Sequence, residues 1–143
     1  MVTDKTDMNV WARLIRVSQT LMNNVETDLK SGQLPPLTWY DVLLELSREK
    51  EGLRPFQLQD RLLIAQYNLS RLLDKLIDAG LIAKENCEKD GRGHVLKITA
   101  SGEGLQKQMW VIYRKSVEDH FSVKLDQGSM GTLDEILIRL QKG

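Results

Sequence analysis

Cysteine, proline and long apolar runs are all scarce in this sequence of 143 residues, which has one cysteine and three prolines. A single cysteine cannot form an internal disulfide, which is typical of a protein kept in a reducing compartment. The longest stretch without a charged residue, 31–40, spans ten residues, whereas a membrane-spanning helix needs about twenty apolar ones. The first seven residues contain no apolar stretch that resembles a signal peptide. We therefore expect a cytoplasmic protein.

An excess of either charge is also absent. Twenty basic and twenty acidic side chains cancel, and the isoelectric point of 6.7 lies below the value above about 9 that is typical of basic nucleic-acid-binding domains. The segment 53–99 carries eight basic and six acidic residues, a net charge of +2, and it is the only basic part of the chain. Charge alone therefore gives weak support to nucleic-acid binding, and only in the middle of the sequence.

The overall composition is that of an ordinary globular domain, with 41% hydrophobic and 28% charged residues. A chain of this length buries roughly two-thirds of its unfolded surface, so it needs neither a disulfide nor a metal to fold. Two histidines and one cysteine offer no metal-ligand spacing. We expect one domain, with no metal and no cofactor.

Apolar residues recur at helical spacing in the first half of the chain. In 8–30 they follow an i, i+3, i+4 pattern, and Gly32 with the pair at 35–36 ends that helix. Thr38 and Asp41 have the spacing of a capping box, in which Thr38 accepts from free amides and Asp41 reaches back, so a helix is expected from 38 to near Gly52. A short helix is predicted from Pro55 to about 62, and another over 65–79 with Gly80 as its stop.

The pattern then changes to short β-type runs at 81–83 and 95–98, which flank two glycines and an Asp-Gly pair and so predict a hairpin. Thr99 or Ser101 caps the next, long helix. Gly128 and Gly131 are expected to interrupt the chain before a last short helix over 133–140.

Three short helices followed by a two-stranded hairpin are the order of a winged helix-turn-helix. The predicted fold class is therefore mainly α with a small β-hairpin wing. The winged-helix lobe is expected at 38–99, flanked by dimerisation helices in 8–37 and 100–143. The long apolar stripes of the flanking helices need a partner, and a second copy of the chain is the simplest one.

Between 72 and 102 the sequence resembles the MarR (multiple antibiotic resistance regulator) family of transcription factors. The residues that carry the resemblance occur in the family's order, without a gap between the first and last glycine: 72–76 (LLDKL), Gly80-Leu81-Ile82, Asp90-Gly91-Arg92, Ile98-Thr99 and Gly102. The resemblance covers nearly the whole chain in helix order, although the specific residues lie within about 37–105. It implies a homodimer, with one winged helix per subunit and an interface formed by the first and last helices.

The resemblance also implies a function. Members of the family bind double-stranded DNA at a pseudo-palindromic operator, usually repress transcription, and often release DNA when a small, commonly phenolic, effector binds. We therefore expect a cytoplasmic, sequence-specific DNA-binding regulator.

The polar face of the predicted helix 65–79 is the candidate surface for reading bases. Glutamine and asparagine pair with adenine, arginine pairs with guanine, and tyrosine or serine contacts phosphate. A surface helix is polar by default, but the turn, the hairpin and the flanking helices favour the DNA interpretation. The residues 65–67 (AQY) lack the Ser, Thr or Asp that the family often has near this cap, so no base preference is predicted. The candidates are Gln66, Tyr67, Asn68, Ser70, Arg71 and Lys75.

The hairpin tip supplies the second group of candidates. By resemblance, Arg92 enters the minor groove and Asp90 holds the wing in shape; an arginine there can reach the negative potential of a narrow A·T-rich groove. The alternative is an exposed Asp90–Arg92 ion pair worth under about 1 kcal/mol. Gly91 and Gly93 either allow close approach to the DNA backbone or simply suit a turn. The remaining candidates are phosphate contacts or merely solvated: Arg54, Lys89, His94 and Lys97.

Three further interpretations concern small molecules and other classes of protein. Aromatic residues at helical spacing either belong to the core or line an effector pocket between the dimer helices and the DNA-binding lobe; they are Trp11, Trp39, Tyr40, Trp110 and Tyr113. Cys87 has basic and acidic neighbours that oppose each other, which favours an ordinary wing cysteine over a redox sensor.

No nucleophile motif or phosphate-binding glycine loop is present, so we expect no enzyme. The alternative function is a winged-helix protein-interaction module without DNA binding, which the neutral net charge favours and Arg92 opposes.

Overall fold

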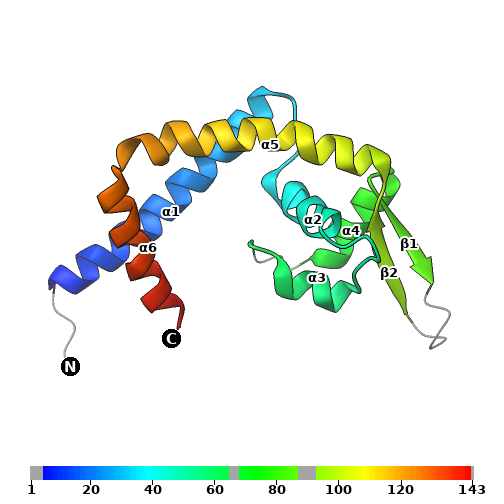
Figure 1. The fold of residues 1–143 in the computed structure, drawn as a ribbon, viewed down its shortest axis with the longest axis horizontal. Coiled ribbons are helices and arrows are strands. Elements are labelled where there is room, and N and C mark those ends of the chain that lie inside the picture. The colour runs from blue at the N-terminus through cyan, green and yellow to red at the C-terminus, as the bar shows by residue number, and fades with distance from the viewer. Residues whose placement is uncertain (1–4, 65–67, 87–92, 143) are drawn as a thin grey trace. The chain divides into compact units, whose positions relative to one another are not determined.

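The computed structural model describes residues 5–64, 68–86 and 93–142. They form helices and one antiparallel hairpin, which confirms the predicted mainly α fold class (Figure 1). The chain divides into two compact units. The first, Leu29–Ile112, is called the wing lobe below. The second combines the residues up to Asp28 with those from Tyr113 onward and is called the terminal unit. Helices α1 (Lys5–Ser31) and α5 (Ala100–His120) contribute residues to both.

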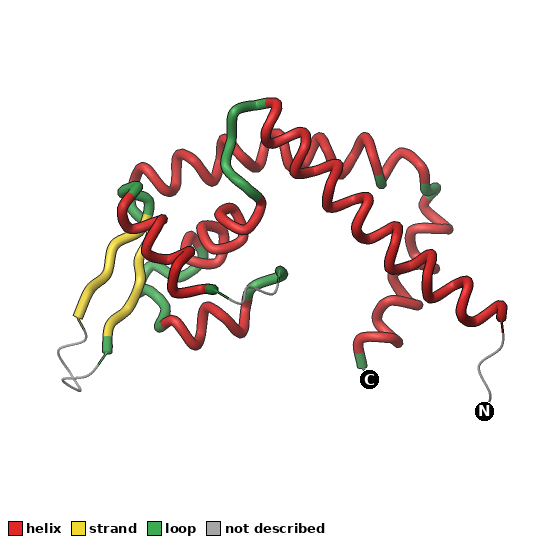
Figure 2. The backbone as a smooth tube through the Cα atoms, turned by 180° about the vertical axis from the view of Figure 1, so that it is seen from behind, coloured by secondary structure: helices red, strands yellow, loops and turns green. Residues whose placement is uncertain are grey.

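The wing lobe is built around one apolar cluster. Helices α2 (Leu37–Ser47), α3 (Pro55–Arg61) and α4 (Leu69–Asp78) enclose it together with strands β1 (Ile82–Asn86) and β2 (His94–Ile98). In Figure 2 the two strands lie side by side at one edge of the lobe. Burying this many aliphatic side chains, at about 1.5–3 kcal/mol each, is the main force that holds the lobe together. The cluster comprises Val42, Leu43, Leu46, Leu53, Leu58, Leu69, Leu72, Leu73, Leu76, Leu81, Ile82 and Leu96.

The start of α2 differs from the predicted capping box. The helix begins at Leu37 after Pro36, whose backbone is extended, and no side chain caps it. Thr38 therefore lies inside the first turn, where its hydroxyl is past the capping position. Asp41 is 7% exposed, and its carboxylate accepts a hydrogen bond from the N–H of Ile64 at 2.9 Å. The capping-box prediction is wrong, because the pair of prolines sets the entry of the chain and Asp41 has a tertiary partner.

The start of α3 and the end of α4 follow the prediction. Pro55 opens α3, and the backbone N–H of Arg54 donates to the side-chain oxygen of Gln57 at 2.9 Å. Gly80 ends α4 with φ +75°. Its N–H bonds to the carbonyl of Ile77 at 2.9 Å, while the next N–H bonds to Leu76 at 3.0 Å. These two bonds form a Schellman motif, which satisfies the last carbonyls of the helix.

The hairpin is tied to the segment before α3 by one backbone pair. β1 and β2 are antiparallel, with Ile82 opposite Ile98 and Asn86 opposite His94. Leu53 lies beside β2, since its N–H donates to the carbonyl of Leu96 at 3.0 Å and its carbonyl accepts from Leu96 at 2.8 Å. The hairpin therefore continues into the helix-turn-helix through main-chain bonds as well as through the core.

The base of the hairpin is closed where α5 begins. The hydroxyl of Thr99 donates to the carbonyl of Gly80 at 2.7 Å and accepts from the N–H of Gly102 at 3.1 Å. Thr99, not Ser101, is therefore the cap of α5. A Cβ atom at Gly102 would collide with the carbonyl oxygen of Leu81. Only glycine allows the first turn of α5 to approach the chain this closely.

The terminal unit contains the first part of α1, the end of α5, a short 3-10 turn at Ser122–Lys124, and α6 (Gln127–Gln141). The expected interruption by Gly128 and Gly131 is wrong, because both lie inside α6. The side chain of Asp126 caps this helix by accepting from the N–H of Ser129 at 2.7 Å. Each internal glycine costs a helix only about 1 kcal/mol, so a capped helix with an apolar stripe tolerates both.

One polar cluster joins α1 to α5 inside the terminal unit. The Asp28 carboxylate accepts a hydrogen bond from the hydroxyl of Ser116 at 2.6 Å and lies 3.1 Å from Nε2 of His120. The Ser116 hydrogen bond is the main cause that lowers the pKa of Asp28, and His120 adds to it. The two partners lie one turn apart on α5, so a single carboxylate on α1 holds both.

Apolar side chains of the terminal unit are mostly exposed in the single chain. α6 has no buried residue, and Trp11 on α1 is 58% exposed. The described residues contain no helix that is long and apolar enough to cross a membrane. The large exposed apolar residues of the unit are Met8, Val10, Trp11, Leu14, Ile15, Val17, Val123, Ile136, Leu137, Ile138 and Leu140.

Candidate nucleic-acid interface

Helix α4 has one buried and one exposed face, as the sequence predicts. Leu69, Leu72, Leu73 and Leu76 are buried in the core of the wing lobe. Their burial fixes the rotation of the helix about its axis, because these residues recur at i, i+3, i+4 and i+7. Three of the predicted DNA contacts consequently lie on the exposed side: Ser70, Arg71 and Lys75.

The start of α4 is later than predicted. The first helical residue is Leu69, and Asn68 occupies the capping position with φ −114° and ψ 54°, outside the helix. Asn68 is exposed, but its side chain makes no capping hydrogen bond. A pattern of apolar residues cannot distinguish the last residue of a turn from the first of a helix, and this explains the shift. Gln66 and Tyr67 lie outside the described residues.

Acidic residues limit how much of the exposed face suits DNA. Asp74 and Asp78 are exposed on the same helix, one and two turns after Ser70. The helix N-terminus carries a partial positive charge that favours phosphate. The first turn of α4, with Ser70 and Arg71, is therefore the part with both suitable side chains and suitable electrostatics.

Arg54 connects the start of α3 to the hairpin. The structure places its guanidinium beside Gly93, because a Cβ atom built at Gly93 would lie 3.1 Å from Nη1 of Arg54. Gly93 has φ +70°, a conformation that favours glycine, and it directly precedes β2. Two residues that the sequence suggests separately are thus brought together at the outer end of β2.

The remaining hairpin candidates have different surroundings. His94 is half-buried and pairs with Asn86 at the end of the ladder. Lys97 forms an ion pair with Glu85 at 2.9 Å, and the bond to Glu85 raises the pKa of Lys97. The positive charge of Lys97 is therefore already paired with a carboxylate in the DNA-free protein. Four predicted contacts of the tip lie outside the described residues, as does Cys87: Lys89, Asp90, Gly91 and Arg92.

Two contacts that sequence reasoning missed hold the helix-turn-helix in place. The Asp41–Ile64 hydrogen bond links α2 to the segment between α3 and α4. Arg61 at the end of α3 forms an ion pair with Glu49, which follows α2, at 2.8 Å. Each contact joins residues far apart in sequence, so no local motif signals them. The only sequence signal is that Asp41 lies among the apolar positions of α2.

The predicted effector aromatics do not all belong to one unit. Tyr40 and Trp110 in the wing lobe stack with their ring centroids 6.3 Å apart and 17° between planes. The hydroxyl of Tyr40 accepts from the side-chain amide of Gln106 at 3.4 Å, and burial raises the pKa of Tyr40. Trp39 packs against the core of the same lobe. Trp11 and Tyr113 belong to the terminal unit.

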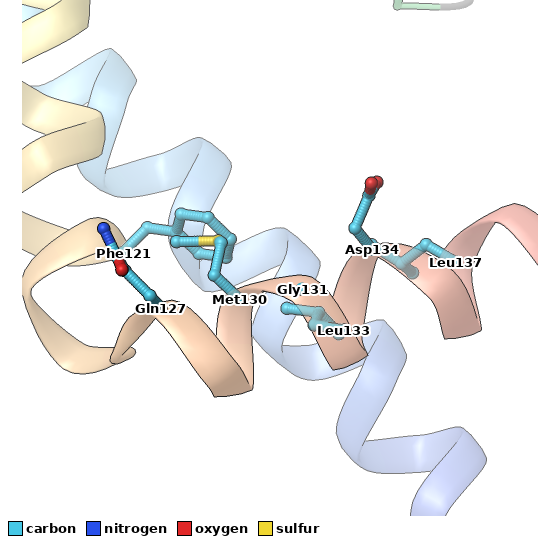
Figure 3. Close-up of a pocket in the computed structure, with 7 residues that line it drawn as sticks. All are labelled: Phe121, Gln127, Met130, Gly131, Leu133, Asp134 and Leu137. Carbon is cyan, nitrogen blue, oxygen red and sulfur yellow. The ribbon is translucent and has the colours of Figure 1, made fainter.

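A hollow of about 440 Å³ lies in the terminal unit and contains none of these five aromatics. Its lining residues come from α6 and from Phe121, which directly follows α5 (Figure 3). Leu137 lines the hollow and is partly exposed, so the hollow is a groove in an uncovered apolar face. The lining residues are Phe121, Gln127, Met130, Gly131, Leu133, Asp134 and Leu137. Among the described residues, no cluster of His, Cys, Asp and Glu has the arrangement of a metal site.

Comparison with known proteins supports the winged-helix architecture. The model of the MarR family matches residues 33–93, which include α2, α3, α4 and β1 and end directly before β2. The whole chain is similar to AbsC, a MarR family transcriptional regulator from Streptomyces coelicolor, with 26% identity and a TM-score of 0.85. That similarity covers 99% of this chain and 96% of AbsC.

Two structures solved with DNA share the fold. Sco3205, a MarR family regulator from Streptomyces coelicolor in complex with DNA, has 21% identity over 100% of this chain and 90% of its own, with a TM-score of 0.90. A mutant of MarR from E. coli complexed with operator DNA has 21% identity over 96% and 99% of the two chains, with a TM-score of 0.80. AbsC and Sco3205 are described as transcriptional regulators. The matched family model over 33–93 and the fold shared over the full chain show that this protein is similar to MarR family transcriptional regulators.

Proposed function

We propose that the protein is a sequence-specific DNA-binding transcriptional regulator that acts as a homodimeric repressor. The observation that carries the proposal is the orientation of α4, whose buried leucines turn Ser70 and Arg71 outward at the start of the helix. The first turns of the second helix of a helix-turn-helix are the part that reaches base edges in the major groove. The DNA complexes of Sco3205 and of the E. coli MarR mutant support the same use of this fold.

The dimer is the second part of the proposal. Exposed apolar side chains line α1 and α6 of the terminal unit, while Val25 and Ser116 are its buried residues among those described. A soluble protein rarely leaves so much apolar surface in water, and a second copy offers a matching surface by symmetry. In such a dimer the two α4 helices would enter successive major grooves about 34 Å apart on a pseudo-palindrome, with the wings in flanking minor grooves.

Effector release is the third part. A ligand that binds better to a dimer with the wrong spacing of its lobes lowers the population that fits DNA. In the wing lobe, the stacked pair of Tyr40 and Trp110 offers an aromatic surface on which such a ligand could bind. Trp110 is 45% exposed, so one edge of the pair is open to solvent.

The test is binding of the purified full chain to a fluorescent DNA fragment from its own upstream region, measured across a salt series. Tight, sequence-selective binding is expected, and log K should fall with log salt by about 0.9 for each phosphate neutralised. Arg71→Glu and Arg92→Glu should each abolish binding. Lys107→Glu is the matched control, because it makes the same charge change at an exposed position on α5.

The outcomes separate the two functions considered for this fold. Binding that ignores DNA sequence, or that survives both charge reversals, would contradict the proposal. It would favour a winged-helix module that contacts another protein. In that case the exposed acids Asp74 and Asp78 of α4 become the part of the helix to test.

A further inference from the structure

Arg54 reaches from the start of α3 to Gly93, directly before the start of β2. Its backbone opens α3, and the preceding residue, Leu53, is paired with Leu96 in both directions. Its guanidinium extends along the hairpin to Gly93, where Nη1 occupies the space next to the missing side chain. The hairpin is therefore held to this segment at two points: the backbone pair at Leu96 and the guanidinium at Gly93.

Two points of contact define a direction, whereas one does not. The Leu53–Leu96 pair lies at the middle of β2, and Gly93 directly precedes the strand at its outer end. Without the contact at Gly93, the outer half of the hairpin would be attached to this segment only through that pair. The planar guanidinium packed on the glycine limits this motion, since a planar group with fixed geometry loses little freedom when it packs.

Gly93 differs from Gly80 in a way that isolates this contact. Both have positive φ, +70° and +75°. A Cβ atom at Gly80 would meet nothing within 4 Å, while at Gly93 it would meet Nη1 of Arg54. Backbone conformation alone therefore favours glycine at 80, and the guanidinium adds a second reason at 93.

We propose that Arg54 is a positioning residue that fixes the direction of the wing relative to α3, and that DNA flanking the operator is recognised through this constraint. This role rests on the proposed function. It differs from the phosphate contact that the sequence suggests for Arg54, because a phosphate contact contributes the same binding energy whatever the flanking bases are.

The first experiment measures how Arg54 affects the choice of flanking sequence. Fluorescence anisotropy compares two DNAs that share the operator core and carry either A·T or G·C flanks. The wild-type protein should prefer A·T flanks, and Arg54→Ala should reduce the ratio of the two Kd values at least threefold toward one. Arg54→Lys keeps the charge but lacks the planar group, so it should not restore the ratio. A uniform loss of affinity with an unchanged ratio, or full rescue by lysine, would overturn the proposal.

The second experiment needs no DNA. The urea midpoints of Gly93→Met and Gly80→Met are compared with and without Arg54→Ala. Methionine is unbranched and cannot hydrogen-bond to the guanidinium strongly, and both sites have a similar positive φ. Gly93→Met should lower the midpoint more than Gly80→Met, and the difference should vanish in the Arg54→Ala background. A difference that persists there would overturn the Arg54–Gly93 contact. Failure of the wild-type protein to bind either DNA would instead overturn the proposed function, and the DNA role of Arg54 with it.

Discussion

The carboxylate of Asp41 accepts a hydrogen bond from the backbone N–H of Ile64 at 2.9 Å, across 23 positions of the sequence. This bond ties α2 to the segment that leads into α4. Because Asp41 is buried, its carboxylate cannot exchange this partner for water without a cost. We therefore expect the placement of the proposed recognition helix to depend on a buried residue of α2.

Replacing Asp41 tests this dependence. Asp41→Ala leaves the Ile64 N–H without its acceptor, so the free energy of unfolding should fall by about 1–3 kcal/mol. Asp41→Asn keeps an acceptor oxygen and should lose less than half of that. Urea unfolding of the two variants is the measurement. Equal losses would show that the charge, not the hydrogen bond, is what matters.

The fold was largely predictable because its elements are marked locally. Leucines at helical spacing in α4, Pro55 at the start of α3 and Gly80 at the end of α4 each act within a few residues of themselves. Asp41 was misread for the opposite reason. Its spacing from Thr38 matches a local motif, but its partner is a backbone amide in a distant turn. The interruption predicted at Gly128 and Gly131 is absent because the Asp126 cap and the apolar stripe of α6 outweigh the low helix propensity of glycine.

The candidate site was predictable to the same extent. Burial of one face of α4 fixes the outward direction of Ser70, Arg71 and Lys75, and that face is visible as a pattern of leucines. The neighbours of Arg54 and Lys97 were not visible. Which residue meets Gly93, and that Glu85 pairs with Lys97, depends on strand register and on the approach of α3 to β2. These are properties of the folded chain.

Gly102 should be the least replaceable glycine among those described. Gly102→Ala drives a methyl group into the carbonyl oxygen of Leu81 and into Ile98, so we expect a loss of roughly 3 kcal/mol from overpacking. Gly104→Ala is the control in the same helix. Its Cβ meets nothing within 4 Å, and it should stabilise the protein by about 0.5–1 kcal/mol. Thermal unfolding of both variants decides, and a tolerated Gly102→Ala would contradict the close approach.

The Asp28 cluster predicts how stability depends on acid. The hydrogen bond from Ser116, aided by His120, lowers the pKa of Asp28 in the folded state. A carboxyl with a lowered folded pKa contributes stability that is complete above its unfolded pKa of about 3.9 and is lost as the pH falls through the folded value. Wild-type protein should therefore lose more stability than Asp28→Asn below about pH 4. Urea midpoints from pH 6 down to about pH 2 measure this.

Ser116→Ala refines the same experiment. It removes the strongest cause of the lowered Asp28 pKa, so its acid profile should lie between those of the wild type and Asp28→Asn. Ser101→Ala, which removes the same hydroxyl at an exposed position near the start of α5, serves as the control. Identical profiles for wild type and Asp28→Asn would refute the assignment.

The Glu85–Lys97 ion pair makes a prediction for DNA binding. The carboxylate of Glu85 lies 2.9 Å from the ammonium group of Lys97 on the hairpin. Glu85→Gln should therefore leave the Lys97 cation available for a phosphate. Affinity for DNA should rise, and the slope of log K against log salt should steepen by up to about 0.9. Glu103→Gln, at an exposed position on α5, makes the same charge change and should leave the slope as it is. An unchanged slope for Glu85→Gln would show that Lys97 does not reach DNA.

The uncovered face of α6 makes a prediction for assembly. Leu137 is 41% exposed in the single chain, and Leu137→Asp should dissociate the proposed dimer because it places a charge in an apolar interface. Phe56→Asp is the matched control: Phe56 is 63% exposed but belongs to the wing lobe. Sedimentation equilibrium of the two variants gives the answer. A monomeric wild-type protein, or equal effects of both variants, would contradict the dimer proposed for the terminal unit.

The closure at the base of the hairpin has a consequence for how this fold diversifies. Thr99 hydrogen-bonds to Gly80 and Gly102, and Gly102 lies against Leu81. The start of β1 and the end of β2 are therefore fixed to one another at the base of the hairpin. A pair of residues inserted beyond Asn86 and before Gly93 leaves all of these contacts in place, while each added residue extends a strand by about 3.3 Å. The length of the hairpin can therefore change in related sequences independently of the helices. The distance that its tip extends from the lobe would change while the fold of the lobe stays the same.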